Sequence, residues 1–313
     1  MIDSCAHFVL ICVSVRFKCG GSRRRRHDGA LFCDYEASEA WTGPCPQCGR
    51  NYDIVRDRPI DDARLSLATL AMAKPPERLS TGCKEFDYVL GGGIVPGSTV
   101  ILTGPPGTGK TTVLIQAAGA IATATGKRVL YTSGEQNKND IGLFAARLGI
   151  LNPNIDVLGN EGDCYKITAE AERRKPVFLV VDSAQTAFVP DVGGDVGSPI
   201  QIKAVANWLT SFGKVENVSV MLVSHVNKEN DLAGPRALEH LVDAICYLEP
   251  YISEEDSEDE VEIDETTLAT LREFVIGKNR FGPPGLRGAV EMTEKGLQTP
   301  NKAVSKRILL ADG

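Results

Sequence analysis

The chain has 313 residues, of which 42% are hydrophobic and 24% are charged, and its net charge is −7. These proportions are those of an ordinary soluble protein. No apolar run approaches the roughly 20 residues that a membrane-spanning helix needs, which excludes a membrane-spanning protein and predicts a cytoplasmic one with no membrane partner.

Residues 1–58 hold six of the nine cysteines and the basic run Arg23–Arg26. The apolar run Ala6–Val15 follows no basic segment, so it does not fit a secretory signal. It is interpreted as a strand or as a remnant of an upstream start codon. Without a secretory signal, clustered cysteines favour a metal site over disulfides. We expect a small Cys-rich, zinc-finger-like segment here.

Residues 59–80 are predicted to form a linker that begins at Pro59 and ends at the Pro75-Pro76 breaker. A short helix is expected within it, from Asp62 to Met72.

Residues 81–300 alternate short apolar runs with helical stretches, a pattern typical of an α/β protein with a mostly parallel sheet. Residues 301–313 form a tail. The predicted buried strands are Thr99–Thr103, Arg128–Ser133, Ile155–Leu158, Val177–Asp182 and Val218–Ser224, and the predicted helices are Thr111–Thr125, Asp140–Leu148 and Ile200–Lys214.

Past Leu241 the pattern changes to three expected antiparallel strands, at Val242–Leu248, Leu271–Lys278 and Gly288–Glu294. The turn between the first two is an acidic tract, Ser253–Glu265, with nine Asp or Glu residues. Removing these nine charges from the net −7 leaves +2 for the rest of the chain. The tract is interpreted as a solvated loop, with partner docking or self-inhibition as the alternatives.

The sequence Gly104-Pro-Pro-Gly-Thr-Gly109-Lys110-Thr111 directly follows a predicted strand and opens a predicted helix. It fits the phosphate-binding pattern G-x-x-x-x-G-K-[ST] in the context that the pattern requires. Its glycines let several backbone N–H groups point at one phosphate, and the helix N-terminus adds partial positive charge. We expect Lys110 to reach the β- and γ-phosphates and Thr111 to bind Mg2+. The residues predicted to hold ATP are Gly104, Pro105, Pro106, Gly107, Thr108, Gly109, Lys110, Thr111 and Thr112.

Two carboxylates follow predicted strands at the same edge of the sheet. Asp182 ends the run Val177–Val181 and is expected to help hold Mg2+. Glu135, which follows Ser133-Gly134, is the candidate to orient or deprotonate the attacking water. The alternatives are a turn or helix-cap Asp and an exposed loop Glu.

These features resemble the bacterial RadA (Sms) DNA repair family, a branch of the RecA/DnaB-type ATPases, from about Arg78 to Leu297. The pentapeptide Lys278-Asn-Arg-Phe-Gly282 is the most specific element of the resemblance. The other matching segments are Leu79–Gly82, Phe86-Asp87, Val89–Gly97, the phosphate loop, Tyr131–Glu135, Leu238–His240 and Glu291–Leu297.

The resemblance implies a RecA-type core that forms a hexameric ring, with nucleotide between subunits and single-stranded or branched DNA through the middle. It implies an ATP-driven helicase that acts on recombination and repair intermediates by branch migration, with a recombinase as a further partner. Lys278 and Arg280 would neutralise charge at a neighbour's γ-phosphate, as an arginine finger does, and His225 would sense that phosphate. Lys228 and Arg236 would contact DNA phosphates. Taken without the resemblance, each of these five is an ordinary structural or surface residue.

The chain departs from the family in three respects. The expected Lon-like C-terminal domain is missing, the acidic tract replaces a short turn, and the family's zinc finger is irregular. Cys45-Pro-Gln-Cys48 matches the second half of that finger, and two thiolates at this spacing can share one zinc ion. In the first half of the finger only Cys33 lies near the position that the family pattern expects, and Cys19 is expected to supply the missing thiolate. Zn2+ is therefore expected at Cys19, Cys33, Cys45 and Cys48, with His27 as an alternative ligand.

Two other functions remain open at this point. One is a regulatory RecA-fold ATPase that switches protein partners, similar to relatives of the clock protein KaiC. The other is a replicative helicase of the DnaB kind, which would normally carry a helical N-terminal domain in place of the Cys-rich start.

Overall fold

The computed structural model describes residues 74–225, 238–251 and 265–300, together with three short strands near the N-terminus and two single positions, Leu67 and Met72. The chain divides into two compact units, Met1–Lys74 and Pro75–Gly313. In the first, β1 (Arg16–Cys19) pairs antiparallel with both β2 (Glu36–Ala37) and β3 (Ile54–Asp57). Most of the expected linker helix and of the acidic tract lies outside the described residues.

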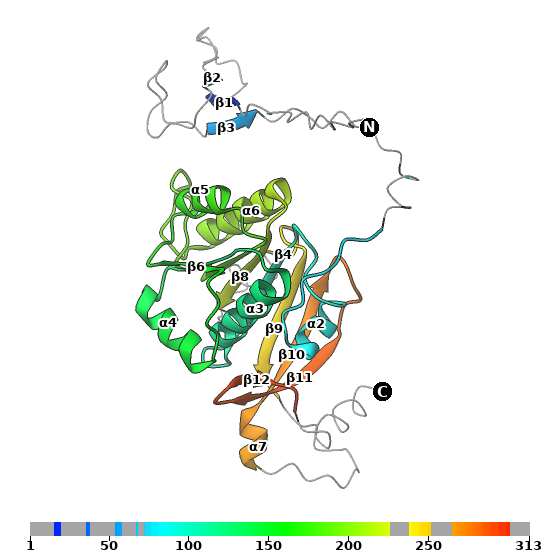
Figure 1. Ribbon diagram of the computed structural model, residues 1–313. Helices are drawn as coiled ribbons and strands as arrows, with labels where there is room; N and C mark the ends of the chain where they lie inside the picture. Colours follow the sequence, from blue (N-terminus) through cyan, green and yellow to red (C-terminus); the bar gives the residue numbers. More distant parts are fainter. Residues whose placement is uncertain are drawn as a thin grey trace, which may run out of the picture. The chain divides into compact units, whose positions relative to one another are not determined.

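The second unit is built on a nine-stranded sheet (Figure 1) in the order β12-β11-β10-β9-β4-β8-β7-β5-β6. Six neighbouring strands, from β9 to β6, run parallel to one another, and β10, β11 and β12 extend the sheet antiparallel. The strands are β4 (Thr99–Gly104), β5 (Val129–Ser133), β6 (Ile155–Gly159), β7 (Phe178–Asp182), β8 (Ser219–His225), β9 (Ala244–Pro250), β10 (Leu271–Asn279), β11 (Arg287–Thr293) and β12 (Gly296–Gln298).

Helices cover both faces of this sheet because the central strands are apolar on both sides, as buried parallel strands are. Successive side chains of a strand point to opposite faces, so Val100 and Leu102 of β4 enter one core and Ile101 enters the other. The helices are α2 (Lys84–Val89), α3 (Lys110–Thr125), α4 (Lys138–Arg147), α5 (Cys164–Arg174), α6 (Pro199–Glu216) and α7 (Glu265–Thr270).

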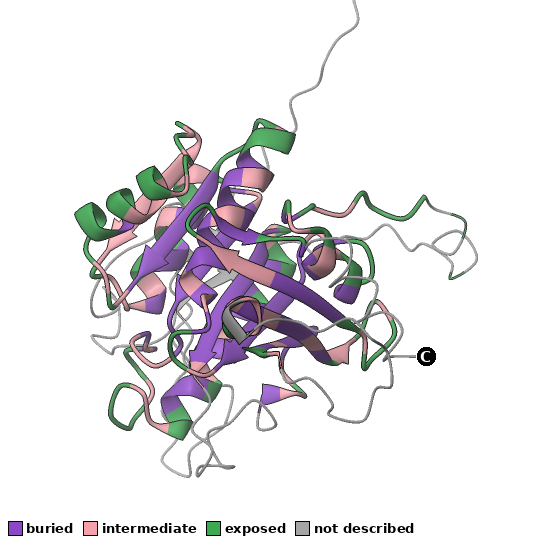
Figure 2. Ribbon diagram, turned by 90° about the horizontal axis from the view of Figure 1, so that it is seen from below, coloured by how far each residue is buried: buried purple, intermediate pink, exposed green. Residues whose placement is uncertain are grey.

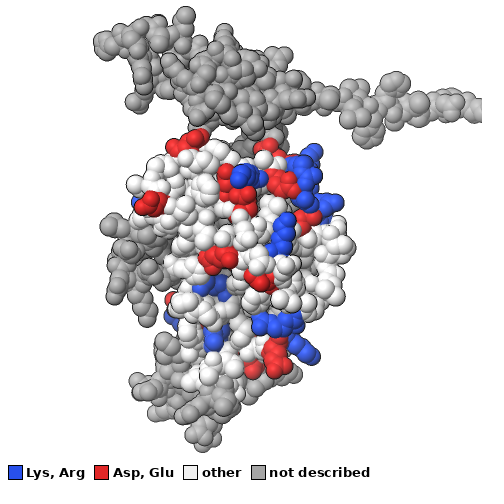
Figure 3. Space-filling model, turned by 90° about the vertical axis from the view of Figure 1, so that its left-hand side faces the viewer, with Lys and Arg blue, Asp and Glu red and all other residues white. Residues whose placement is uncertain are grey.

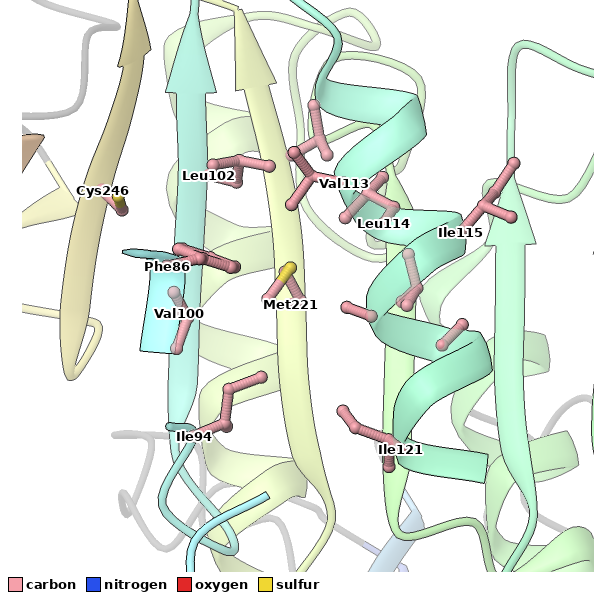
Figure 4. Packing of buried hydrophobic residues seen from close by; sticks show 14 of the residues in the cluster. Phe86, Ile94, Val100, Leu102, Val113, Leu114, Ile115, Ile121, Met221 and Cys246 are labelled. Carbon is pink, nitrogen blue, oxygen red and sulfur yellow. The ribbon is translucent and has the colours of Figure 1, made fainter. Parts of the chain in front are cut away.

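The first core lies between the sheet and α2, α3 and α4, and the second lies between the sheet and α5 and α6. Figure 4 shows the first core, where Val113 and Leu114 of α3 face Leu102 of β4 and Met221 of β8. In Figure 2 the central strands are buried while the helices keep exposed outer surfaces. The strands that carry the predicted phosphate site are therefore held rigidly from both sides.

The predicted mostly parallel α/β sheet is confirmed. One expectation was wrong in part: β9 is antiparallel to β10 but parallel to β4, because the chain crosses over β4 after β8 and enters the sheet in the same direction. Helix α5 was not among the predicted helices. Its signals were present, since Asp163 caps its first turn and both Arg173 and Arg174 lie in its last turn, as helix ends favour.

Candidate nucleotide-binding site at the carboxyl edge of the sheet

The predicted phosphate loop joins the end of β4 to the start of α3, and its glycines are required by the backbone. Gly104 has a φ of +148°, and a Cβ there would lie 2.1 Å from the backbone oxygen of Leu248. Gly109 has a φ of +102°, in the left-handed region, and a Cβ there would meet the side chain of Met292. Only glycine adopts these conformations without strain, so the chain can turn tightly enough to form an anion cradle.

The start of α3 is open to an anion. Side chains of Asn137, Asp163 and Ser198 cap the first turns of α4, α5 and α6, whereas the N-cap of α3 is Gly109, which has no side chain to bond to the first turn. The first N–H groups of a helix have no partner within the helix and carry partial positive charge. The N-terminal end of α3 is therefore suited to hold a phosphate group.

Lys110 is the first residue of α3 and is buried. Its Nζ donates hydrogen bonds to the backbone oxygens of Gly104, at 2.8 Å, and Pro105, at 2.7 Å. Burial lowers the pKa of Lys110, while the carboxylates of Asp182 and Glu135 oppose that shift. The amine thus lies on the loop itself, where phosphate oxygens can replace the two carbonyl groups.

Asp182 ends β7, with one carboxylate oxygen facing the start of α3. Its Oδ2 accepts a hydrogen bond from the hydroxyl of Tyr131, at 3.2 Å, and lies 3.5 Å from the hydroxyl of Thr111. Burial and the nearby Glu135 raise the pKa of Asp182 from 3.8 to about 6. A hydroxyl and a carboxylate at this separation offer the oxygen ligands that Mg2+ prefers, so the residues present fit that ion.

A second group of polar side chains surrounds Glu135. The hydroxyl of Ser183 donates to Oε1 of Glu135 at 2.7 Å, and Nε2 of His225 lies 3.6 Å from the same oxygen. Glu135 is 42% exposed and His225 is 35% exposed, so both can reach solvent. Burial, followed by the charge of Lys110, lowers the pKa of His225, which favours the neutral imidazole at neutral pH.

Strand register explains why residues so distant in the sequence meet. Gly104 pairs with His225 across β4 and β8, and Ser133 pairs with Asp182 across β5 and β7. Strands β4, β8, β7 and β5 are consecutive in the sheet and parallel, so their carboxyl ends share one edge. In open α/β sheets this edge is where ligands bind. The structure brings together five predicted site residues there: Lys110, Thr111, Glu135, Asp182 and His225.

Lys278 and Arg280 lie at the other edge of the sheet. Nζ of Lys278 donates to the backbone oxygens of Glu239 and Val242, and Nη1 of Arg280 lies 3.0 Å from Oδ1 of the buried Asp243. Asp243 accepts a hydrogen bond from the backbone N–H of Thr99, the first residue of β4. The phosphate loop starts at the far end of that strand, about 16 Å away at the usual rise per residue. Neither basic side chain meets the phosphate loop of its own chain.

The predicted DNA contacts, Lys228 and Arg236, lie outside the described residues, as do Cys33, Cys45 and Cys48 and the side chain of Cys19. Within the part of the chain that the structure describes, no cluster of three or more His, Cys, Asp or Glu residues could hold a metal ion. No helix there is long and apolar enough to cross a membrane.

The side of the molecule that lies to the left in Figure 1 carries acidic and basic side chains close together (Figure 3). A surface that binds nucleic acid through phosphate contacts is predominantly basic. The view in Figure 3 shows no such continuous basic surface among the described residues.

Sequence reasoning missed three side chains that organise the site. Tyr131 and Ser183 bond to the two carboxylates, and Nε2 of Gln185 donates to the hydroxyl of Ser224 and to the backbone oxygen of His225. Tyr131 lies inside a buried strand, where an aromatic residue normally indicates core packing. Ser183 and Gln185 directly follow Asp182, and this proximity was the signal that could have identified them.

Comparison with known proteins places the chain among ATPase-fold relatives. The AAA domain family matches residues 71–231, about half of the chain. The chain is 35% identical over 274 residues to DNA repair protein RadA of Aquifex aeolicus (strain VF5), which covers 85% of this chain and 57% of the relative. It is 38% identical over 232 residues to DNA repair protein RadA of Escherichia coli (strain K12), with 74% and 46% covered. The chain thus spans about half the length of these relatives.

Two solved structures share the fold. A crystal structure of the RadB recombinase matches with a TM-score of 0.51 and 21% identity, over 71% of this chain and 100% of that one. A KaiC-like protein from Pyrococcus horikoshii OT3 matches with a TM-score of 0.56 and 21% identity, over 72% and 100%. At this identity the likeness shows the fold alone, and it confirms the predicted RecA-type α/β core.

Proposed function

Because this chain belongs to the AAA domain family and is a relative of DNA repair protein RadA, we propose that it is a DNA-dependent ATP hydrolase acting on recombination and repair intermediates. The observation that carries the proposal is the meeting of Lys110, Thr111, Asp182 and Glu135 at one edge of the sheet, beside a helix start with no side-chain cap.

Each residue of this edge has a distinct part in the proposed reaction. The N–H groups of the phosphate loop and the amine of Lys110 hold the β- and γ-phosphates. Thr111 and Asp182 would hold Mg2+, which would neutralise phosphate charge when bound. Glu135 orients the attacking water and receives its proton, held in place by the hydroxyl of Ser183. His225, beside Glu135, is placed to sense the γ-phosphate.

The remaining basic groups come from a neighbouring subunit in this proposal. Lys278 and Arg280 lie too far from their own phosphate loop to act within one chain, so their part in catalysis requires a second copy. A head-to-tail contact of this kind generates a ring when the rotation closes. We propose a homohexamer with nucleotide at each interface, in which hydrolysis drives helicase movement and branch migration on single-stranded or branched DNA.

Lys228 and Arg236, in the segment after β8, are the proposed DNA contacts, and a recombinase is a proposed partner. Zinc binding by Cys19, Cys33, Cys45 and Cys48 also remains a proposal, supported by the Cys45-Pro-Gln-Cys48 spacing. Metal analysis of the purified protein tests it: about one equivalent of zinc is expected, and less than half an equivalent would exclude this set of ligands.

The experiment that tests the function is ATP hydrolysis measured at low salt with and without single-stranded DNA. We expect DNA to raise the rate, because phosphate contacts strengthen at low salt. Hydrolysis that DNA does not change would favour the second candidate, a regulatory ATPase that switches protein partners. Absence of hydrolysis under both conditions would contradict both proposals.

A further inference from the structure

Arg78 joins three backbone segments at the edge of the sheet that carries the pentapeptide Lys278–Gly282. Its Nη1 donates to the backbone oxygens of Leu90, at 2.8 Å, and Gly93, at 3.2 Å, and its Nη2 donates to the backbone oxygen of Phe281 at 2.7 Å. Leu90 and Gly93 belong to the loop after α2, whereas Phe281 is 203 residues from Arg78 in the sequence. One guanidinium group therefore connects the pentapeptide to the loop after α2.

The same two loops contact each other without any side chain between them. A Cβ on Gly91 would lie 3.5 Å from the Cα of Gly282, and 3.4 Å from Nη1 of Arg78. The amide of Asn279 donates to the backbone oxygen of Leu90, the same oxygen that accepts from Arg78. Arg78 and the pentapeptide thus share an acceptor, and the position of one determines the position of the other.

The hydrogen bonds of Arg78 are distinct from the contacts that Lys278 and Arg280 make themselves. Those two side chains bond to residues 239–243 on one side of the pentapeptide. Arg78 holds the other side through the carbonyl of Phe281, the residue directly after Arg280. The backbone that carries Arg280 is therefore fixed from both directions. A planar group with several donors suits this arrangement, because one lysine amine cannot span carbonyls that lie in separate segments.

We infer that Arg78 is a positioning residue for the neighbour's ATP: it holds the pentapeptide so that Arg280 can reach the γ-phosphate of the adjacent subunit. The inference rests on the proposed shared site between subunits. Arg78 contacts no nucleotide in this scheme and lies away from its own phosphate loop. Its loss should leave the subunit's own phosphate loop intact while making that subunit a poor donor of Arg280.

The expected effect is on turnover and not on nucleotide affinity. A displacement of about 1 Å at a catalytic group can cost about 10²-fold in rate, so kcat of assembled Arg78→Ala should fall by about this factor while KM for ATP stays within about 2-fold. Arg147→Ala is the matched control, because Arg147 is a surface arginine on α4 that stacks on Phe144. Its kcat should be unchanged. Arg78→Lys should behave like Arg78→Ala.

Mixed oligomers provide the decisive readout. Lys110→Ala has a defective phosphate loop but an intact pentapeptide, and Arg280→Ala has the reverse. Equal mixtures of these two should regain up to about a quarter of the wild-type rate, since about one interface in four then joins two intact halves in a head-to-tail ring. Arg78→Ala should regain activity with Lys110→Ala and should regain none with Arg280→Ala.

The possible failures are distinguishable. No recovery in the mixture of Lys110→Ala and Arg280→Ala would overturn the shared site, and the inference with it. A second outcome is that hydrolysis recovers in that mixture and also in the mixture of Arg78→Ala with Arg280→Ala. It would show that Arg78 serves its own phosphate loop, and the inference would be wrong. If Arg78→Ala does not fold, as judged by thermal unfolding, the same mixtures are made with Arg78→Lys. Recovery of that folded variant in mixtures with Lys110→Ala but not with Arg280→Ala, together with normal ATP binding, supports the inference, whereas full activity on its own overturns it.

Discussion

The hydroxyl of Tyr131 donates a hydrogen bond of 3.2 Å to Oδ2 of Asp182, the oxygen that also faces the hydroxyl of Thr111. Asp182 is thereby fixed before any ligand arrives, although it is buried and lies close to Glu135. A fixed and buried carboxylate is costly for the ligand-free protein, because burial disfavours its charged form. Functional sites commonly hold charged groups in such unfavourable environments.

This cost can be measured by replacing Asp182 with Asn. Because the pKa of Asp182 is raised from 3.8 to about 6 in the folded state, its ionisation destabilises the protein increasingly as pH rises through that interval. At pH 8 the free energy of unfolding of ligand-free Asp182→Asn should exceed that of the wild type by up to about 3 kcal/mol, so the variant is the more stable protein. Near pH 4 the difference should vanish. Urea unfolding at the two pH values checks this, and a less stable variant at pH 8 would contradict it.

Lys110→Ala should abolish ATP hydrolysis, because the amine that holds the β- and γ-phosphates is lost. Steady-state phosphate release from the assembled protein measures this. Lys127→Ala is the control, since Lys127 is an exposed lysine just past the other end of α3 and its loss should leave the rate unchanged. Turnover retained by Lys110→Ala would place the site elsewhere.

Glu135→Gln should bind ATP normally and hydrolyse it about 10²- to 10⁴-fold more slowly, as expected when a general base is lost. Ser183→Ala should cause a smaller decrease of about 10-fold, because it only releases the hydrogen bond that positions Oε1 of Glu135. Single-turnover hydrolysis separates the two. In the double variant the Ser183 change should have no further effect, and additive losses would show that Ser183 acts independently of Glu135.

Arg280→Ala should leave nucleotide binding by the isolated subunit unchanged and lower hydrolysis by the assembled protein by about 10³-fold, the usual range for a finger supplied in trans. Arg287→Ala serves as the comparison. Arg287 is an exposed arginine on the adjacent strand β11 and also pairs with a carboxylate, Glu273. A normal rate for assembled Arg280→Ala would exclude its assigned role.

Gly104→Ala should unfold more readily than Gly107→Ala, and this comparison tests the geometry of the loop independently of activity. At Gly104 the added Cβ meets the backbone oxygen of Leu248 at 2.1 Å, whereas at Gly107 it enters open space and only the positive φ opposes it. We expect a loss of more than about 3 kcal/mol for the first and about 1 kcal/mol for the second. Equal losses by chemical unfolding would contradict the close contact with Leu248.

Sequence alone could predict that the phosphate loop, Asp182 and Glu135 lie at one edge of the sheet, because each follows an apolar run that is recognisable locally. It could not identify the partners of the two carboxylates. Tyr131 bonds to Asp182, 51 residues away, and only the register between β5 and β7 brings them together. The bond from Arg78 to Phe281 is out of reach for the same reason, since no local pattern connects segments that meet only when the sheet is complete.

Strand β4 carries the phosphate loop at one end, and at the other end Thr99 bonds to Asp243, the carboxylate partner of Arg280. Both ends belong to the same buried strand, so the two attachments cannot move independently. In the proposed ring this strand would connect a subunit's own nucleotide pocket to the arginine that the subunit lends to its neighbour, so nucleotide binding at one interface would alter the geometry of the next.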